Sequence, residues 1–90
     1  MKAKLVLYSR ADCCLCEKMK EAIRQVAATI PLELEEIDVD SSAQLREQFG
    51  DEAPVLFIDG RKAFKYRVTA RELERRVGRR ALWPRLAVIK

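Results

Sequence analysis

Three cysteines stand within four positions near the start of the chain, at Cys13, Cys14 and Cys16. They follow a short apolar run and open an amphipathic one, so Cys13 and Cys16 are expected where a strand gives way to a helix. The start of a helix offers unpaired N–H groups and a partial positive charge, and both favour a thiolate over a thiol. At this spacing, one sulfur can attack an outside disulfide and the other can resolve the mixed disulfide. A Cys-x-x-Cys pair in a strand–helix–strand context indicates redox chemistry.

The rest of the composition excludes several other kinds of chemistry. The chain has no histidine, which removes imidazole-dependent catalysis and the commonest metal ligand. A zinc site needs four ligands, and one chain offers only three crowded cysteines. Three cysteines within four positions cannot form a framework of structural disulfides either. We therefore expect no cofactor and no resident metal.

The length of 90 residues allows one domain, which we place at residues 1–82 with a tail at residues 83–90. The apolar run near the N-terminus is too short for a signal peptide, and no stretch is long enough to cross a membrane. We therefore expect a cytoplasmic protein without a membrane partner, in a compartment that keeps thiols reduced.

Charge is spread unevenly along the chain, although the formal net charge is only +4. Residues 1–30 carry 6 basic and 3 acidic side chains, residues 31–60 carry 1 and 9, and residues 61–90 carry 11 and 2. A basic segment can indicate nucleic-acid binding. We favour a solvated basic helix face that pairs with the acidic middle of the chain, and we expect no nucleic-acid partner.

The first half of the chain predicts a strand–helix–strand unit. Residues 2–8 form an apolar run typical of a buried strand, and from residue 14 apolar residues recur every three or four positions until Pro31 ends the helix. The apolar positions of a second strand at residues 32–39 change parity, which predicts a bulge near Glu35 or a late entry into the strand there. Elements of these lengths form a right-handed parallel crossover.

A short helix and a hairpin follow. We expect a helix over residues 41–49, capped by Asp40 or Ser41 and ended by Gly50 in the left-handed conformation. The pair Asp59-Gly60, with an apolar run on each side, is a strong hairpin signal.

The hairpin joins strands expected over residues 55–58 and 61–66, and a capping box from Thr69 to Glu72 begins the last helix. The buried stripe of that helix is expected to comprise Leu73, Val77 and Leu82. The predicted fold is therefore α/β, in the order β-α-β-α-β-β-α, with a four-stranded mixed sheet and three helices.

This order and the cysteine motif together resemble the thioredoxin fold, and specifically its small glutaredoxin-like branch. Three local patterns carry the resemblance, which extends over residues 2–80. The stretch Tyr8-Ser9-Arg10-x-x-Cys13-x-x-Cys16 is similar to the start of glutaredoxins. Ala53-Pro54-Val55 stands where the superfamily places a cis-proline before its third strand, and the segment from Val55 to Gly60 is similar to that strand and its hairpin.

The resemblance implies roles for individual residues. Cys13 would be the nucleophile and Cys16 the resolving thiol. Pro54 would lie against the sulfurs, and Ala53 would offer its backbone N–H and C=O to an extended substrate. Arg10 would stand where glutaredoxins often place a lysine that contacts a carboxylate of glutathione.

Two further residues near the motif receive accessory roles. For Tyr8 we favour half-buried packing on the sheet over direct participation in chemistry. For Cys14 we favour a spectator role, and the alternatives are a third thiol for glutathionylation or a ligand in a cluster site.

The chain also departs from the glutaredoxin pattern. Glutaredoxins usually follow the fourth strand with a Gly-Gly pair and an acidic residue that hold the γ-glutamyl end of glutathione, whereas this chain has Tyr66-Arg67-Val68-Thr69. Glu52 replaces the usual threonine and brings a negative charge near the groove. We therefore expect weak glutathione specificity.

The leading functional prediction is a thiol–disulfide oxidoreductase that reduces disulfides with Cys13 and Cys16. Its partners would be a disulfide-containing protein or small molecule as substrate, and a reductase or glutathione as electron donor. Arg10, the helix start and Lys18 would favour the reactive thiolate. The alternative is a binding module for Cu(I) or an iron–sulfur group, because soft thiolates select such metals. A helix before the third strand and the Ala53-Pro54 pair do not belong in the β-α-β-β-α-β order of copper carriers. A thioredoxin-like adaptor without turnover is less favoured, because the dithiol is intact.

Overall fold

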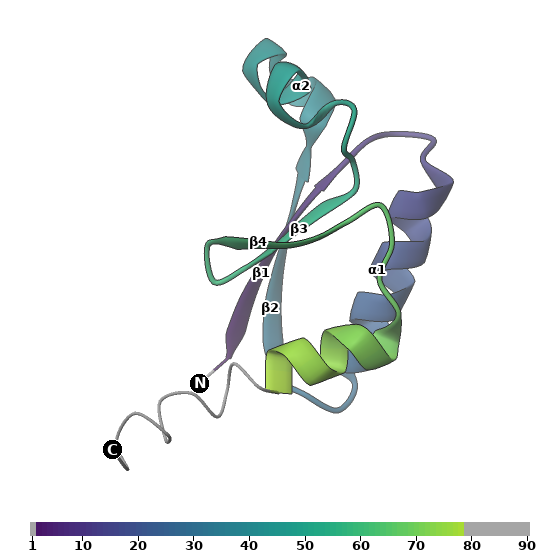
Figure 1. The fold of residues 1–90 in the computed structure, drawn as a ribbon, viewed down its shortest axis with the longest axis vertical. Coiled ribbons are helices and arrows are strands. Elements are labelled where there is room, and N and C mark those ends of the chain that lie inside the picture. Colours follow the sequence, from purple (N-terminus) through teal and green to yellow (C-terminus); the bar gives the residue numbers. More distant parts are fainter. Residues whose placement is uncertain (1, 79–90) are drawn as a thin grey trace.

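A central four-stranded sheet organises the chain in the computed structural model, which describes residues 2–78 (Figure 1). The elements are β1 (Ala3–Ser9), α1 (Cys14–Ala27), β2 (Leu32–Asp38), the single 3₁₀ turn η1 (Val39–Ser41), α2 (Ala43–Phe49), β3 (Val55–Ile58), β4 (Arg61–Lys65) and a helix over residues 70–78. The predicted α/β order is thereby confirmed. Leu82 and the predicted tail lie outside the described residues. No helix within residues 2–78 has the length and apolar character needed to cross a membrane.

The sheet has the strand order β2-β1-β3-β4. β1 pairs with β2 in parallel, as the α1 crossover requires, and β3 pairs antiparallel with both β1 and β4. β1 lies inside the sheet because its alternate residues Leu5 and Leu7 are fully buried, while Val6 and Tyr8 on the other face are half-buried. The C-terminal end of this strand leads directly into the cysteine motif.

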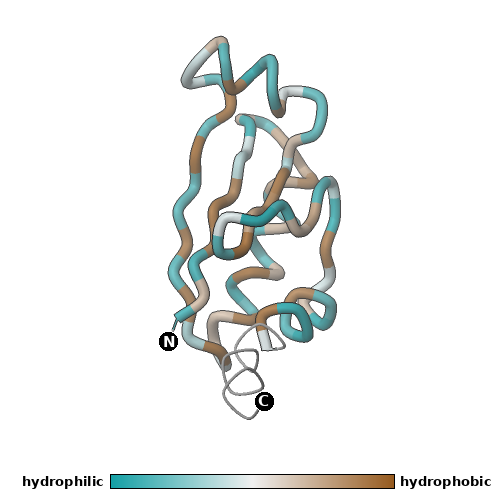
Figure 2. Tube along the Cα trace, turned by 60° about the vertical axis from the view of Figure 1, so that its left-hand side comes forward, coloured by the Kyte–Doolittle hydropathy of each residue, from teal (hydrophilic) through white to brown (hydrophobic). Residues whose placement is uncertain are grey.

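Two apolar clusters cover the two faces of the sheet. On one face, α1 and the helix over residues 70–78 pack their apolar stripes against β1 and β3, and this is the larger cluster. On the other face, Phe49 of α2 packs with Val39 and Val55. Figure 2 shows brown and teal segments alternating along the strands. Successive side chains of a strand point to opposite faces of the sheet, so this alternation is expected where one face is more buried than the other.

The bulge or late strand entry predicted near Glu35 is wrong. β2 pairs with β1 without a break from the pair Ala3–Leu32 to the pair Ser9–Asp38. The change in parity of the apolar residues indicates a bulge only if every one of them is buried. β2 is an edge strand, and it keeps a regular register by leaving Leu34 41% exposed.

Both ends of the short helix differ from their prediction. The cap of α2 is Ser42, whose hydroxyl accepts the N–H of Leu45 at 3.0 Å, because residues 39–41 form the preceding 3₁₀ turn. Gly50 is right-handed, with φ −55° and ψ −38°, and its N–H donates to the carbonyl of Arg46. A Cβ atom at Gly50 would lie 2.4 Å from that oxygen, so glycine is needed here for close approach and not for a positive φ.

Three local predictions are confirmed. Asp59 and Gly60 both have positive φ, 51° and 84°, as the tight hairpin between β3 and β4 requires. The capping box is present, because the hydroxyl of Thr69 accepts the N–H of Glu72 at 3.1 Å and Glu72 in turn accepts the N–H of Thr69 at 3.3 Å. The peptide bond between Ala53 and Pro54 is cis.

Candidate active site

Cys13 occupies the N-terminal cap of α1. Its backbone is extended, and its sulfur accepts a hydrogen bond from the N–H of Cys16 at 3.2 Å. Its carbonyl accepts the N–H of Glu17, also at 3.2 Å. The cap therefore points the sulfur at the N–H groups of the first turn. Because Cys13 is partly exposed, an external disulfide can reach it.

Cys16 lies one turn further into the helix and faces the core, with an exposed fraction of 1%. The pKa of the Cys16 thiol is raised to about 11. Burial is the larger cause, and a hydrogen bond between the side chains of Cys16 and Cys13 is the second. A backbone hydrogen bond from Arg10 and the charge of Lys20 act in the opposite direction. At neutral pH Cys16 is therefore a protonated thiol that outside reagents reach poorly, whereas Cys13 is accessible.

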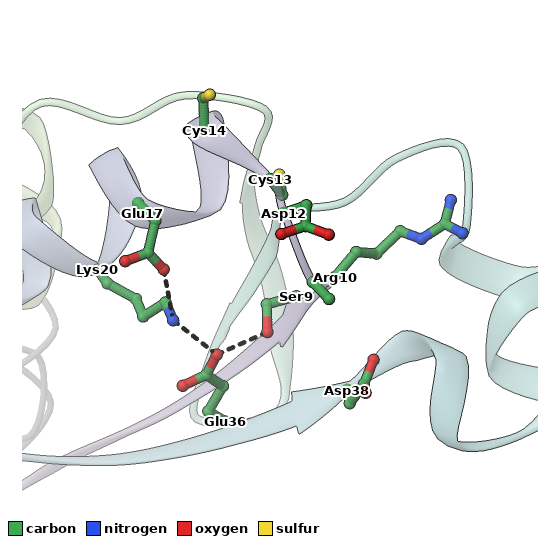
Figure 3. A pocket seen from close by; sticks show the side chains of 10 residues that line it. Ser9, Arg10, Asp12, Cys13, Cys14, Glu17, Lys20, Glu36 and Asp38 are labelled. Atoms are coloured by element: carbon green, nitrogen blue, oxygen red, sulfur yellow. Dashed lines mark hydrogen bonds and ion pairs between the residues drawn. The ribbon is translucent and has the colours of Figure 1, made fainter.

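Cys14 is the first residue of α1, and its side chain is exposed. Figure 3 shows its sulfur pointing away from the charged side chains of the pocket below the motif. None of the three cysteines forms a disulfide. The spectator role of Cys14 stays a prediction.

Pro54 and Ala53 lie in the loop that enters β3. Pro54 is buried, and its carbonyl accepts the N–H of Tyr66 at 2.8 Å. Because Val55 pairs with Tyr8, this loop lies beside the end of β1 from which the chain continues to the cysteines. The N–H of Ala53 donates to the carbonyl of Phe49 at 3.0 Å, so it closes the end of α2. This N–H is thus engaged within the protein, and the role of Ala53 in substrate binding stays a prediction.

Arg10 points away from the cysteines in Figure 3. Its guanidinium donates two hydrogen bonds to the carboxylate of Asp40, at 3.2 Å and 3.1 Å, and a third to the carbonyl of Gly50 at 3.2 Å. A carboxylate of the protein itself therefore occupies the position that the resemblance reserves for glutathione. A role of Arg10 in substrate binding stays a prediction.

Tyr8 lies on the face of the sheet opposite α1. Its ring stacks on Phe49 with centroids 4.4 Å apart and meets Phe57 edge-on at 5.5 Å. The interpretation of Tyr8 as half-buried sheet packing is confirmed.

A charged network that is not among the predicted features lies beside the motif. Ser9, the one buried polar residue of the described chain, donates its hydroxyl to Glu36 at 2.7 Å. Lys20 bridges Glu36 at 3.0 Å and Glu17 at 2.7 Å (Figure 3). The hydrogen bonds from Ser9 and then Lys20 lower the pKa of Glu36, so this carboxylate stays ionised at neutral pH. The parity of Ser9 with Leu5 and Leu7 was a signal that this hydroxyl is buried.

The same network forms part of the wall of a pocket of about 620 Å³ that Cys13 and Cys14 also line. Its charged lining is mainly acidic, because Asp12 and Asp38 join Glu17 and Glu36. Among residues 2–78, no three histidine, cysteine or acidic side chains are grouped so that they could hold a metal ion.

Glu52, whose charge is expected from the sequence to disfavour glutathione, is engaged by neighbouring cations. Lys62 donates a hydrogen bond to its carboxylate, and the ammonium group of Lys65 lies 3.7 Å away. The hydrogen bond from Lys62 is the main cause that lowers the pKa of Glu52. The two lysines thus largely offset the negative charge that Glu52 brings near the expected glutathione groove.

Known proteins share both the sequence pattern and the fold. The model of the family described as "Glutaredoxin-like domain (DUF836)" matches residues 4–78. An uncharacterized protein of Mycobacterium tuberculosis is 31% identical over 78 residues, which cover 81% of this chain and 80% of that protein.

Solved structures agree with this match. The target protein XcR50 from X. campestris is 32% identical with a TM-score of 0.68, and the match covers 79% of this chain and 91% of that one. Protein Ne2328 from Nitrosomonas europaea is 29% identical with a TM-score of 0.73, over 86% and 93% of the two chains. Chloroplastic thioredoxin z, 18% identical over 87% and 77% with a TM-score of 0.68, shares the fold alone. The chain therefore belongs to the glutaredoxin-like domain family (DUF836), and it has the thioredoxin fold.

Proposed function

We propose that this protein is a thiol–disulfide oxidoreductase in which Cys13 attacks the substrate and Cys16 resolves the intermediate. The observation that carries the proposal is the unequal placement of two thiols three residues apart. Cys13 is a partly exposed helix cap, whereas Cys16 is buried and its pKa is raised to about 11. Such a pair presents one sulfur to the substrate and holds the other in reserve. Membership of a glutaredoxin-like family supports a redox role in general.

The reaction balances in two exchange steps. In the first, the thiolate of Cys13 attacks one sulfur of the substrate disulfide; a mixed disulfide forms, and the other substrate sulfur leaves as a thiolate that takes up a proton. In the second, Cys16 loses its proton and attacks the sulfur of Cys13, and the second substrate thiol departs. The substrate gains two electrons, and the protein is left with a Cys13–Cys16 disulfide. A reductase or glutathione then returns the two electrons.

Substrate docking would use the loop that enters β3. This loop lies beside the end of β1, and Ala53 has a carbonyl that an extended segment could use as an acceptor. We propose a disulfide-containing protein or small molecule as substrate and the reducing cytoplasm as the place of action, because disulfide reduction needs a reduced dithiol.

A turnover assay on hydroxyethyl disulfide tests the proposal. The reduced protein is regenerated by glutathione with glutathione reductase, or by thioredoxin reductase, and wild type is compared with Cys13→Ser, Cys16→Ser and Cys14→Ser. We expect Cys13→Ser to abolish turnover with either donor and Cys14→Ser to retain it. Full activity of Cys13→Ser would reject the proposed mechanism.

The metal-carrier alternative is disfavoured by the element order. α2 stands between β2 and β3, where the copper-carrier order has no helix.

A further inference from the structure

The loop of residues 50–54, which joins α2 to β3, is held by hydrogen bonds along its length. The N–H groups of Gly50, Glu52 and Ala53 donate to carbonyls in the last turn of α2, at distances of 2.8 to 3.0 Å. These bonds fix the start of the loop relative to α2, but they do not connect it to the cysteines. The carbonyl groups of the loop make that connection.

The first of these carbonyls is bound by the turn that carries the nucleophile. Arg10 precedes Cys13 by three residues, and its guanidinium donates to the carbonyl of Gly50 at 3.2 Å. Two bonds to the carboxylate of Asp40, at 3.2 Å and 3.1 Å, orient the guanidinium in this position. Arg10 therefore extends away from the cysteines in Figure 3 because it spans from their turn to the start of the loop.

The next carbonyl is bound by Tyr66, which follows β4. The hydroxyl of Tyr66 donates to the carbonyl of Asp51 at 3.2 Å, and its N–H donates to the carbonyl of Pro54 at 2.8 Å. Tyr66 has φ 69°, a backbone conformation that costs energy for a residue with a side chain and that persists only where the surrounding contacts hold it. One residue thus fixes the loop at two points.

The carbonyl of Ala53 lies within this fixed segment, between Asp51 and Pro54. It accepts no hydrogen bond from any group in residues 2–78, so a substrate could use it as an acceptor. A loop that is ordered before binding loses little conformational entropy when a substrate docks, and this favours association. The hydrogen bonds from Arg10 and Tyr66 supply that order.

We propose that Arg10 and Tyr66 are positioning residues, which hold the docking loop at a fixed place relative to Cys13 and so favour disulfides carried by a polypeptide that bonds with the carbonyl of Ala53. The inference rests on the proposed function and adds the residues that set the substrate preference. A small disulfide that reaches Cys13 without touching the loop gains nothing from this order.

Single-turnover kinetics of the fully reduced protein test this inference, because they need no electron donor. The loss of protein thiols is followed after mixing with hydroxyethyl disulfide, or with the disulfide-linked dimer of a neutral peptide of about seven residues with a central cysteine. A second peptide is N-methylated on both sides of its cysteine, and therefore lacks the N–H groups that could donate to Ala53. The measured quantity is the rate with each peptide divided by the rate with hydroxyethyl disulfide.

This ratio should fall about threefold in Tyr66→Phe and about threefold in Arg10→Met, as expected for the loss of one exposed hydrogen bond to the loop. Tyr66→Phe keeps the ring and removes only the hydroxyl. In wild type the N-methylated peptide should give a lower ratio, and neither variant should lower it further. The ratio cancels any general effect of Arg10 on the reactivity of the thiols.

Arg24→Met is the matched control, because it breaks an exposed pair with Glu21 on α1, away from the loop. It should leave the ratio unchanged. A variant that is merely destabilised lowers both rates alike, so an unchanged ratio in Tyr66→Phe would overturn the inference. An equal fall with the N-methylated peptide would also overturn it, and both results would leave the proposed function intact. No reaction with any disulfide would reject both.

Discussion

Alkylation of Cys16 should depend steeply on pH, because its buried thiol has a pKa of about 11. The thiolate is the form that reacts. From that pKa, the fraction of Cys16 present as thiolate is about 10⁻⁴ at pH 7 and about 10⁻² at pH 9. The alkylation rate of Cys16 should therefore rise about tenfold per pH unit across this range, without a plateau.

This alkylation rate is measured with limiting iodoacetamide, which is added to the reduced protein at pH values from about 6.5 to about 9.5. Cys13 should be labelled first at neutral pH, since it caps the helix and is partly exposed, and the exposed Cys14 serves as an internal reference for reagent access. Tryptic cleavage leaves all three cysteines in the peptide between Arg10 and Lys18, so fragmentation must assign the labelled sulfur.

The variant Cys13→Ala sharpens the test. The hydrogen bond with Cys13 and the charge of Cys13 both raise the pKa of Cys16, so the pH profile of Cys16 should move to lower pH in this variant. Two results would refute the assignment of roles. One is labelling of Cys16 ahead of Cys13, and the other is an alkylation rate of Cys16 that reaches a plateau about 2 pH units below its pKa.

Three further predictions concern the intermediate, the donor and the fold. Cys16→Ser should accumulate a mixed disulfide between Cys13 and the substrate, detected as a mass adduct; if the adduct appears in Cys14→Ser instead, Cys14 is the resolving thiol. Glutathione-dependent reduction of hydroxyethyl disulfide should be well below that of an ordinary glutaredoxin, and equal activity would show that the missing glycine pair is dispensable. Ser42→Ala should lower the free energy of unfolding in urea by about 1 kcal/mol, because it removes the cap of α2. Ser41→Ala should have a smaller effect, and the reverse order would place the cap at Ser41.

Local sequence signals predicted the helices and strands because the interactions that start and end them join residues that are close in the sequence. Asp59 and Gly60 tolerate the positive φ values of a tight hairpin, and a threonine three residues before a glutamate suffices to start a helix. The prediction for Gly50 failed for a related reason. Glycine is required both for a positive φ and for close backbone approach, and the sequence does not distinguish the two needs.

The site was predictable as a set of residue types but not as a set of contacts. The cysteine motif identified the thiols, whereas their unequal burial depends on how α1 packs on the sheet. The pairing of Ser9 with Glu36 depends on the register between β1 and β2, and the pairing of Arg10 with Asp40 depends on the position of η1. These contacts join residues about 30 positions apart, and no local pattern encodes them.

The tertiary contacts also give a physical reason to expect weak glutathione specificity, in addition to the missing glycine pair. The charge of Glu52 is not the obstacle, because Lys62 and Lys65 offset it. The glutaredoxin pattern places anion recognition at the position of Arg10 and after the fourth strand.

In this chain a carboxylate of the protein itself occupies the first of these places, because Asp40 binds Arg10 through two hydrogen bonds. Glutathione would have to displace this carboxylate, which the fold holds nearby and which therefore competes at high effective concentration. The dithiol itself is untouched by this competition. We therefore expect Asp40→Asn to raise glutathione-dependent activity while leaving the single-turnover rate with hydroxyethyl disulfide unchanged. An unchanged glutathione dependence in that variant would show that Asp40 does not block the site.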